Sequence, residues 1–219
     1  SIHMKHSLTD NDRIFLESRV AEVEKQTGIQ IVLATTKRSD SYIEIPWKAF
    51  SLGVSVSGLP VFFIGLFLPL WATNTTILLS ITGMLAPGIL LALSTTVFRS
   101  VARLFLSKHR KETETLQYAR SLFLSRELFA TKERKAILLL ISEFERQVVI
   151  LPDTGIREMF NPEAMDKLMA GMIEPLKNKS IRRAFEAGLI ELQQSFSQQG
   201  ANGSITNELT NKIIAEDSL

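Results

Sequence analysis

One long uncharged run constrains this chain more than any other feature. The stretch from Ala49 to Phe98 contains no Asp, Glu, Lys, Arg or His. A helix of about 20 apolar residues crosses a hydrocarbon core of about 30 Å, so this stretch suffices for two such helices. The predicted spans cover about 52–72 and 77–97, with the polar residues 73–76 as the turn between them. The alternative, a buried hairpin of a soluble protein, seldom contains so long an uncharged run. The sequence therefore predicts a two-helix transmembrane hairpin in contact with a lipid bilayer.

The charges that flank the run predict an orientation. Lys48 precedes it, and the residues that follow it include Arg99, Arg103, Lys108, Arg110 and Lys111. The turn has no Lys or Arg, so the positive-inside rule places both ends on the cytoplasmic side. Trp47 and Trp71 lie near the two ends of the first span, where indole rings favour the membrane interface. We expect a multi-pass protein of the cell inner (cytoplasmic) membrane with cytoplasmic N- and C-termini.

The other residues predict one soluble domain that the hairpin interrupts. Residues 1–4 are interpreted as an expression remnant, 5–48 as the first part of the domain, 99–198 as the second part and 199–219 as a polar tail. A helix is expected from Thr9 or Asp10 to about Gln26, followed by a strand at 29–34. Apolar runs at 135–141 and 147–151 predict two strands buried on both faces, and their short connection makes them antiparallel.

Helices cover the remaining segments. One is expected from 99 to about 129, either as a cationic stretch on anionic headgroups or as a rod that extends the second span. Two more begin at Asn161 and after Ser180, and a short one is expected near 209–215. The methionine-rich helix after Asn161 is either a core element or an adaptable binding groove. This order of elements predicts an α/β fold with helices on both faces of a small mixed sheet.

Composition excludes several kinds of site. The chain has no cysteine, so disulfides, zinc ribbons and thiol catalysis are excluded. A net charge of +2 indicates no broad basic face for nucleic acid. Residues 153–155 (DTG) match the aspartic-protease triplet, but that chemistry needs a second carboxylate, which only a homodimer would supply. Residues 151–155 (LPDTG) match a sortase signal but lack the C-terminal span that follows such signals.

Three carboxylates are candidate ligands for Mg²⁺ or Ca²⁺. Glu24, Glu145 and Asp153 lie at predicted strand or helix ends, so we expect them to converge on one edge of the sheet. Arg134 or Arg146 would then bind a phosphate oxygen, with Asp153 as a further candidate catalytic residue. The alternative is that Glu145 and Arg146 form a solvated turn pair and Asp153 is a turn former.

A family resemblance is carried mainly by the segment TKERKAILLLIS at residues 131–142. Further matching residues are Glu145-Arg146, 148–150 and 153–156, together with 24–32 near the N-terminus and 184–190 near the last helix. These segments resemble the TPM domain, and most closely a subgroup with a membrane hairpin after the first strand, often encoded beside LemA-type membrane proteins. Lys135-Ala136 depart from the usual polar residue followed by glycine. Only Asp10 and Asp12 correspond to the Asp-rich motif of exported relatives.

The resemblance implies a three-layer α/β/α sandwich with a mixed sheet, here interrupted by the transmembrane hairpin. Some plant thylakoid relatives are described as acid phosphatases linked to photosystem II repair, and others act as auxiliary subunits of membrane proteins. Two hypotheses follow. The favoured one is a non-catalytic adaptor whose partner is a membrane protein, such as a LemA-type protein, or a second copy in a homo-oligomer. The other is a metal-dependent, acid-phosphatase-like enzyme.

Overall fold

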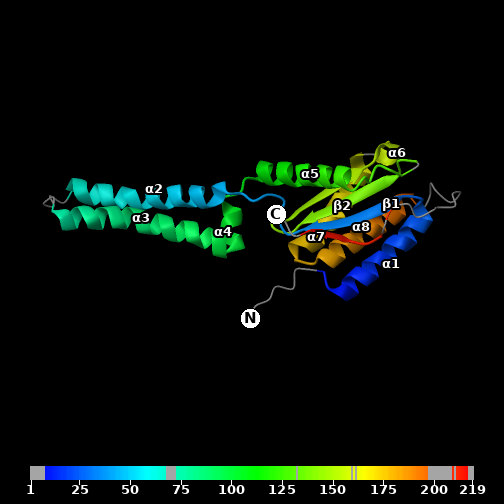
Figure 1. The fold of residues 1–219 in the computed structure, drawn as a ribbon, viewed down its shortest axis with the longest axis horizontal. Coiled ribbons are helices and arrows are strands. Elements are labelled where there is room, and N and C mark those ends of the chain that lie inside the picture. The colour runs from blue at the N-terminus through cyan, green and yellow to red at the C-terminus, as the bar shows by residue number, and fades with distance from the viewer. Residues whose placement is uncertain are drawn as a thin grey trace. The chain divides into compact units, whose positions relative to one another are not determined.

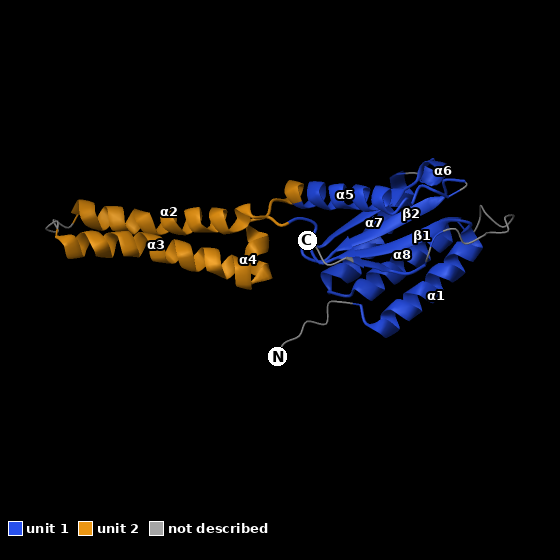
Figure 2. Ribbon diagram, in the orientation of Figure 1, with its two compact units in different colours: residues 1–40, 111–219 blue, residues 41–110 orange. Residues whose placement is uncertain are grey.

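A computed structural model describes residues 8–67, 73–131, 133–158, 160, 162–196, 209 and 211–216 (Figure 1). The chain forms two compact units (Figure 2). The sheet unit comprises residues 1–40 and 111–219, and the hairpin unit comprises residues 41–110, a wider segment than the predicted 49–98. Three predictions fall outside the described residues: the expression remnant at 1–4, the position of Trp71 at the membrane interface, and the helix cap at Asn161.

The first helix begins and ends at residues that sequence rules favour. Helix α1 (Asp10–Thr27) starts in a capping box, in which the Thr9 side chain accepts from the Asp12 amide and the Asp12 side chain accepts from the Thr9 amide. Gly28 ends it with a φ of 76°, a conformation that glycine adopts without strain. Strand β1 (Gln30–Thr36) follows and is buried along its whole length.

The sheet contains four strands in the order β3-β2-β1-β4. Strand β1 runs parallel to β2 (Ala136–Ser142) and to β4 (Ile214–Glu216), whereas β2 pairs antiparallel with β3 (Gln147–Pro152). The predicted mixed sheet and antiparallel pair are therefore confirmed. Strand β2 is buried on both faces as expected, but the same prediction for β3 is wrong. Strand β3 lies at an edge of the sheet, and its residues alternate between buried and half-buried.

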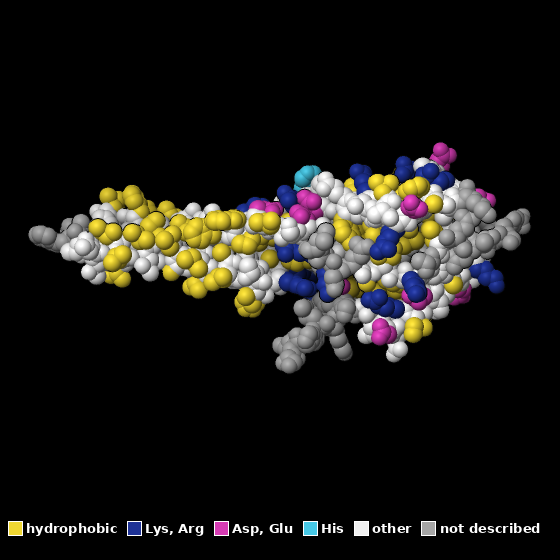
Figure 3. Space-filling model, viewed as in Figure 1, with side chains coloured by type: hydrophobic (Ala, Val, Ile, Leu, Met, Phe, Trp, Pro, Cys, Tyr) yellow, Lys and Arg dark blue, Asp and Glu magenta, His cyan; other side chains and the backbone are white. Residues whose placement is uncertain are grey.

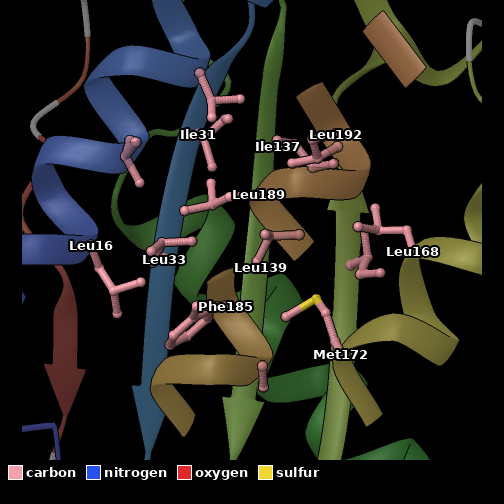
Figure 4. Packing of buried hydrophobic residues seen from close by; sticks show 14 of the residues in the cluster. Leu16, Ile31, Leu33, Ile137, Leu139, Leu168, Met172, Phe185, Leu189 and Leu192 are labelled. Carbon is pink, nitrogen blue, oxygen red and sulfur yellow. The ribbon is translucent and has the colours of Figure 1, made fainter. Parts of the chain in front are cut away.

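Alternate residues of the strands enter two different cores. Ile31, Leu33, Ile137 and Leu139 pack beneath α1, α7 (Pro162–Lys177) and α8 (Ile181–Phe196), as Figure 4 shows. Val32, Ala34, Leu138 and Leu140 pack on the other face, against α5 (Lys108–Ser125). This arrangement confirms the α/β/α sandwich. Met172 is fully buried and Met165 and Met169 pack against the same core, so the methionine-rich helix is a core element.

The C-terminal part of the chain corrects the sequence prediction. The expected short helix near 209–215 is wrong, because residues 214–216 form β4 beside β1. The preceding Ile213 is buried in the core, and the amide of Leu209 donates to Oε1 of Gln30 at 3.0 Å. The rest of the predicted polar tail, residues 199–208, 210 and 217–219, lies outside the described residues.

Two long apolar helices make up most of the hairpin unit. Helices α2 (Glu44–Phe67) and α3 (Asn74–Val97) are both long and apolar enough to cross a membrane. They meet at Gly53 and Gly88, where a Cβ on Gly53 would lie 2.6 Å from the Cα of Gly88. The hydroxyl of Ser57 donates to the carbonyl of Met84 at 2.9 Å. Small residues at such a contact are typical of helices that pack within membranes.

The continuous helix expected from 99 to about 129 is wrong, because residues 105–107 separate two helices within that range. The second apolar helix does not continue into this segment either. Helix α3 ends at Val97, Phe98 is extended with a φ of −106° and a ψ of 103°, and the short α4 (Arg99–Leu104) precedes α5. The hydroxyls of Ser94, Thr95 and Thr96 each donate to a carbonyl three residues earlier. Such local bonds compete with the helix ladder, which accounts for a break that apolar periodicity does not reveal.

Candidate functional site

Asp153 and Arg134 form a paired site at the end of β3. Nε and Nη2 of Arg134 donate to Oδ2 and Oδ1 of Asp153 at 2.8 and 2.9 Å, a two-point contact. The Thr154 amide donates to Oδ1 at 2.7 Å, so Asp153 also caps the short helix α6 (Thr154–Arg157). Burial pushes the pKa of Asp153 upward, but the hydrogen bonds from Arg134 and Thr154 outweigh it and hold the pKa below its ordinary value.

Gly155, the glycine of the DTG triplet, packs against the backbone of Glu133 and Arg134. A Cβ on Gly155 would lie 2.3 Å from the carbonyl oxygen of Glu133 and 2.7 Å from that of Arg134. The Gly155 amide donates to the Arg134 carbonyl at 3.0 Å, and Arg134 itself has a φ of 54°. Through these hydrogen bonds, the triplet holds α6 against residues 133–134, which lead into β2. The turn-former interpretation of Asp153 agrees with this geometry.

Glu145 belongs to a second polar site. It lies in the connection between β2 and β3, at the opposite end of β3 from Asp153. Its carboxylate accepts from the Ser39 amide at 2.9 Å and from the Ser142 hydroxyl. The Ser39 hydroxyl contacts those of Ser142 at 3.0 Å and Thr115 at 3.4 Å. Glu145 is buried, so the expectation of a solvated turn pair holds only for its neighbour Arg146, which is exposed with a φ of 53°.

The Glu145 site lies where the parallel strands β1 and β2 end. In open α/β sheets, ligands bind at the carboxyl ends of the parallel strands. Sequence reasoning missed Ser39, Ser142 and Thr115 as members of this site. A signal was present for two of them, because Ser142 closes the apolar run of β2 and Ser39 follows β1 by three residues.

Glu24 is the third carboxylate, and it lies beside β1. It is 4% exposed, and its Oε1 accepts from the Ile31 amide at 2.7 Å. Burial raises the pKa of Glu24 to about 7, although hydrogen bonds from Ile31 and Asn211 act in the opposite direction. The carboxylate thus satisfies a strand amide at the edge of β1 and contacts the segment that leads into β4.

The structure does not bring the three carboxylates together. Glu145 precedes β3 and Asp153 follows it, and a strand of six residues separates them by about 20 Å. Glu24 lies near the start of β1, the end of the sheet at which Asp153 is found. Among the described residues there is no group of three or more His, Asp or Glu placed to hold a metal ion. That Glu24, Glu145 or Asp153 binds Mg²⁺ or Ca²⁺ remains a prediction for each residue separately, because the three do not share one edge of the sheet.

Comparisons with known proteins agree with this fold. Residues 99–195 match the sequence profile of the family described as the TPM domain. The NMR structure of the BA42 protein from the psychrophilic bacterium Bizionia argentinensis is similar, with a TM-score of 0.58 and 12% identity over 99% of each chain. At that identity the likeness shows the fold alone. No match to a curated protein was found. Residues 99–195 of this α/β fold are therefore similar to the TPM domain.

Proposed function

We propose that this chain is a membrane-anchored TPM protein that acts as a non-catalytic adaptor or auxiliary subunit in a membrane protein assembly. The observation that carries the proposal is the position of the two apolar helices. They are inserted between β1 and β2, neighbouring strands of one sheet, so the anchor is built into the domain and is not appended to one end. Such an insertion ties the domain to the bilayer at two points of the chain.

The contacts of the candidate site residues support an adaptor. The two oxygens of Asp153 bind Arg134 and the Thr154 amide, and those of Glu145 bind Ser39 and Ser142. Each carboxylate fastens one segment of the domain to another. Carboxylates held this way serve the fold, since buried polar groups need such partners.

The proposed topology places both termini in the cytoplasm and the 73–76 turn outside. The chain has no cysteine, so a single introduced thiol reports its own side of the membrane. In spheroplasts, a membrane-impermeant maleimide should label Thr75→Cys at once and Ser121→Cys only after lysis. Both positions are exposed in the folded chain. Labelling of Ser121→Cys before lysis would overturn the orientation.

Isolation of the full chain in mild detergent tests the adaptor role. We expect a defined complex, either with a membrane protein such as a LemA-type protein or with further copies of the chain. The measurement is the mass of the complex by light scattering, with the components identified by mass spectrometry. A chain that is strictly monomeric, both in detergent and in lipid nanodiscs, and carries no stoichiometric partner contradicts the proposal.

A metal-dependent, acid-phosphatase-like activity is the second candidate. The buried cluster of Glu145, Ser142 and Ser39 favours it, because it lies at the carboxyl ends of parallel strands. Phosphate release from a generic phosphate monoester with Mg²⁺ or Ca²⁺ should be compared in the wild type, Glu145→Gln and Asp153→Ala. A metal-dependent activity lost in either variant, with the fold intact, would replace the adaptor proposal. Turnover unchanged in both variants would remove this second candidate.

A further inference from the structure

The short helix α4 exposes apolar and cationic side chains together. Phe98 and Leu104 are 59% and 82% exposed, whereas Ala102 is buried. Arg99 and Arg103 are four residues apart and therefore share one side of the helix, where Nε of Arg103 donates to the Arg99 carbonyl at 3.2 Å. An exposed leucine beside two arginines is the pattern of a helix that lies in a membrane interface.

The hairpin unit gathers its charge at one end. Within residues 41–110, Lys48, Arg99, Arg103, Lys108 and Arg110 are basic and Glu44 is the only acid, so the net charge is +4. Because the whole chain carries +2, the remaining residues sum to −2. Figure 3 shows the apolar side chains along the hairpin, a region that contains no Lys or Arg. The cations of this unit are therefore concentrated around α4 and the first turns of α2.

The lengths of the helices fix where α4 would lie in a bilayer. Helix α3 has 24 residues and rises about 36 Å, which exceeds a hydrocarbon core of about 30 Å. Because Gly53 faces Gly88 and Ser57 binds Met84, the start of α2 near Glu44 is level with the end of α3. Trp47, 69% exposed on that part of α2, is a residue that favours the interface.

We propose that α4 is an interfacial helix that binds the phosphates of anionic lipid headgroups. Arg99 and Arg103 contact the phosphates, and Phe98 and Leu104 enter the boundary of the acyl chains. This inference rests on the proposed membrane anchoring and adds to it a lipid partner. Anionic lipid suits this surface because α4 carries two arginines, the hairpin unit as a whole has a net charge of +4, and the apolar side chains continue those of α3. Each cation near an anionic surface strengthens binding about fivefold.

The depth of α4 can be measured with single thiols, since the chain has no cysteine of its own. Full-length Leu104→Cys and the control Ser121→Cys carry an environment-sensitive fluorophore and are reconstituted into vesicles of phosphatidylcholine and phosphatidylglycerol in equal parts. Lipids brominated on the acyl chain should quench the label at 104 strongly and the label at 121 hardly at all. Equal, weak quenching at the two positions overturns the proposal, as does a label at 104 that is shielded from both water and lipid by protein.

Lipid preference is the second readout. We expect the double variant Arg99→Gln, Arg103→Gln to retain at least tenfold less phosphatidylglycerol, relative to phosphatidylcholine, after purification in mild detergent. The matched control is Arg120→Gln, which removes an exposed arginine of the sheet unit. Equal retention by both variants overturns the headgroup contact.

Extraction at alkaline pH distinguishes the failure of this inference from that of the proposed function. Wild-type chain that is washed from membranes by carbonate contradicts the membrane anchor, and α4 then has no bilayer to bind. Chain that resists carbonate but leaves the label at 104 unquenched contradicts the role of α4 alone.

Discussion

Glu24 takes the place of a neighbouring strand at the start of β1. Strand β4 pairs with Ala34–Thr36, whereas the Ile31 amide binds the Glu24 carboxylate. A buried acid in this role satisfies the amide in either protonation state, because at least one oxygen still accepts. The ionised form nevertheless remains costly in a buried place, which is why the pKa of Glu24 rises to about 7.

The raised pKa of Glu24 predicts how stability depends on pH. The folded state holds this proton up to about pH 7, whereas an unfolded glutamic acid releases it near pH 4.5. The contribution of Glu24 to the free energy of unfolding should therefore be largest below pH 4.5, fall as the pH rises to about 7, and level off above that. Glu24→Gln should remove this decline and raise stability at pH 8 by about 1–2 kcal/mol.

Denaturant unfolding at a series of pH values provides the measurement for Glu24. Glu22→Gln, an exposed residue of the same helix, is the matched control. A Glu24→Gln chain that keeps the wild-type slope between pH 5 and 7 would show that the carboxylate is ionised throughout that range.

Gly155 packs so closely against the backbone of Glu133 and Arg134 that a substitution can test the contact. Gly155→Ala should destabilise the domain by about 2–4 kcal/mol, since its Cβ would overlap two carbonyl oxygens of the Arg134 segment. Gly171→Ala is the control: nothing lies within 4 Å of a Cβ there, and alanine in a helix interior stabilises by about 0.5–1 kcal/mol. Thermal unfolding of the two variants should shift in opposite directions, and equal shifts would contradict the contact.

At the scale of the elements, α2 and α3 pack closely where Gly53 meets Gly88. A Cβ on Gly88 would lie 2.6 Å from Cγ2 of Val54 and 3.0 Å from the Phe50 carbonyl, whereas one on Gly65 would meet nothing within 4 Å. Gly88→Leu should therefore separate α2 from α3 and cost about 1–3 kcal/mol, and Gly65→Leu should cost little. The loss of helical circular dichroism on heating in detergent measures both. A Gly65→Leu chain as unstable as Gly88→Leu would contradict this packing.

Elements that sequence predicted well depend on local or continuous signals. The capping box at Thr9, the apolar run of β2 and the uncharged hairpin are all of this kind. Strand β4 was missed because its three residues become a strand only by pairing with β1, far away in the sequence. The helix break at Phe98 was missed because apolar periodicity continues across it while the Ser and Thr hydroxyls bind the backbone locally.

The structure places Asp153, Arg134 and Glu145 in polar contacts, but it does not group them as the sequence predicted. Asp153 and Arg134 do meet, although no argument from the sequence paired them. The expected convergence with Glu145 conflicts with the antiparallel pairing of β2 and β3, which was itself predicted. Residues that flank such a strand on either side lie at opposite ends of it, so the pairing alone was sufficient to separate Glu145 from Asp153.

At the scale of the whole molecule, the sheet unit has its own core and should fold without the hairpin. The chain leaves it after Asp40 and re-enters it at Lys111, and the nearby Ser39 and Thr115 hydroxyls lie 3.4 Å apart. Replacing residues 41–110 by a short Gly/Ser linker should therefore give a water-soluble domain with native secondary structure. Circular dichroism and a cooperative denaturant transition would check it. Aggregated protein without such a transition would show that the domain needs residues 41–110 to fold.

The parallel pairing of β1 with β2 has a consequence for how the protein is made. Gln30 pairs with Ala136, so β1 leaves the ribosome well before its neighbour exists, and both apolar helices are synthesised in the interval. Closing the β1–β2 ladder must therefore follow the synthesis of both apolar helices. Until β2 has been synthesised, α1 and β1 lack the strand that pairs with β1 along its whole length. Completion of the sheet is therefore a late event in synthesis, and a chain that stops before β2 leaves the backbone groups on that edge of β1 unpaired.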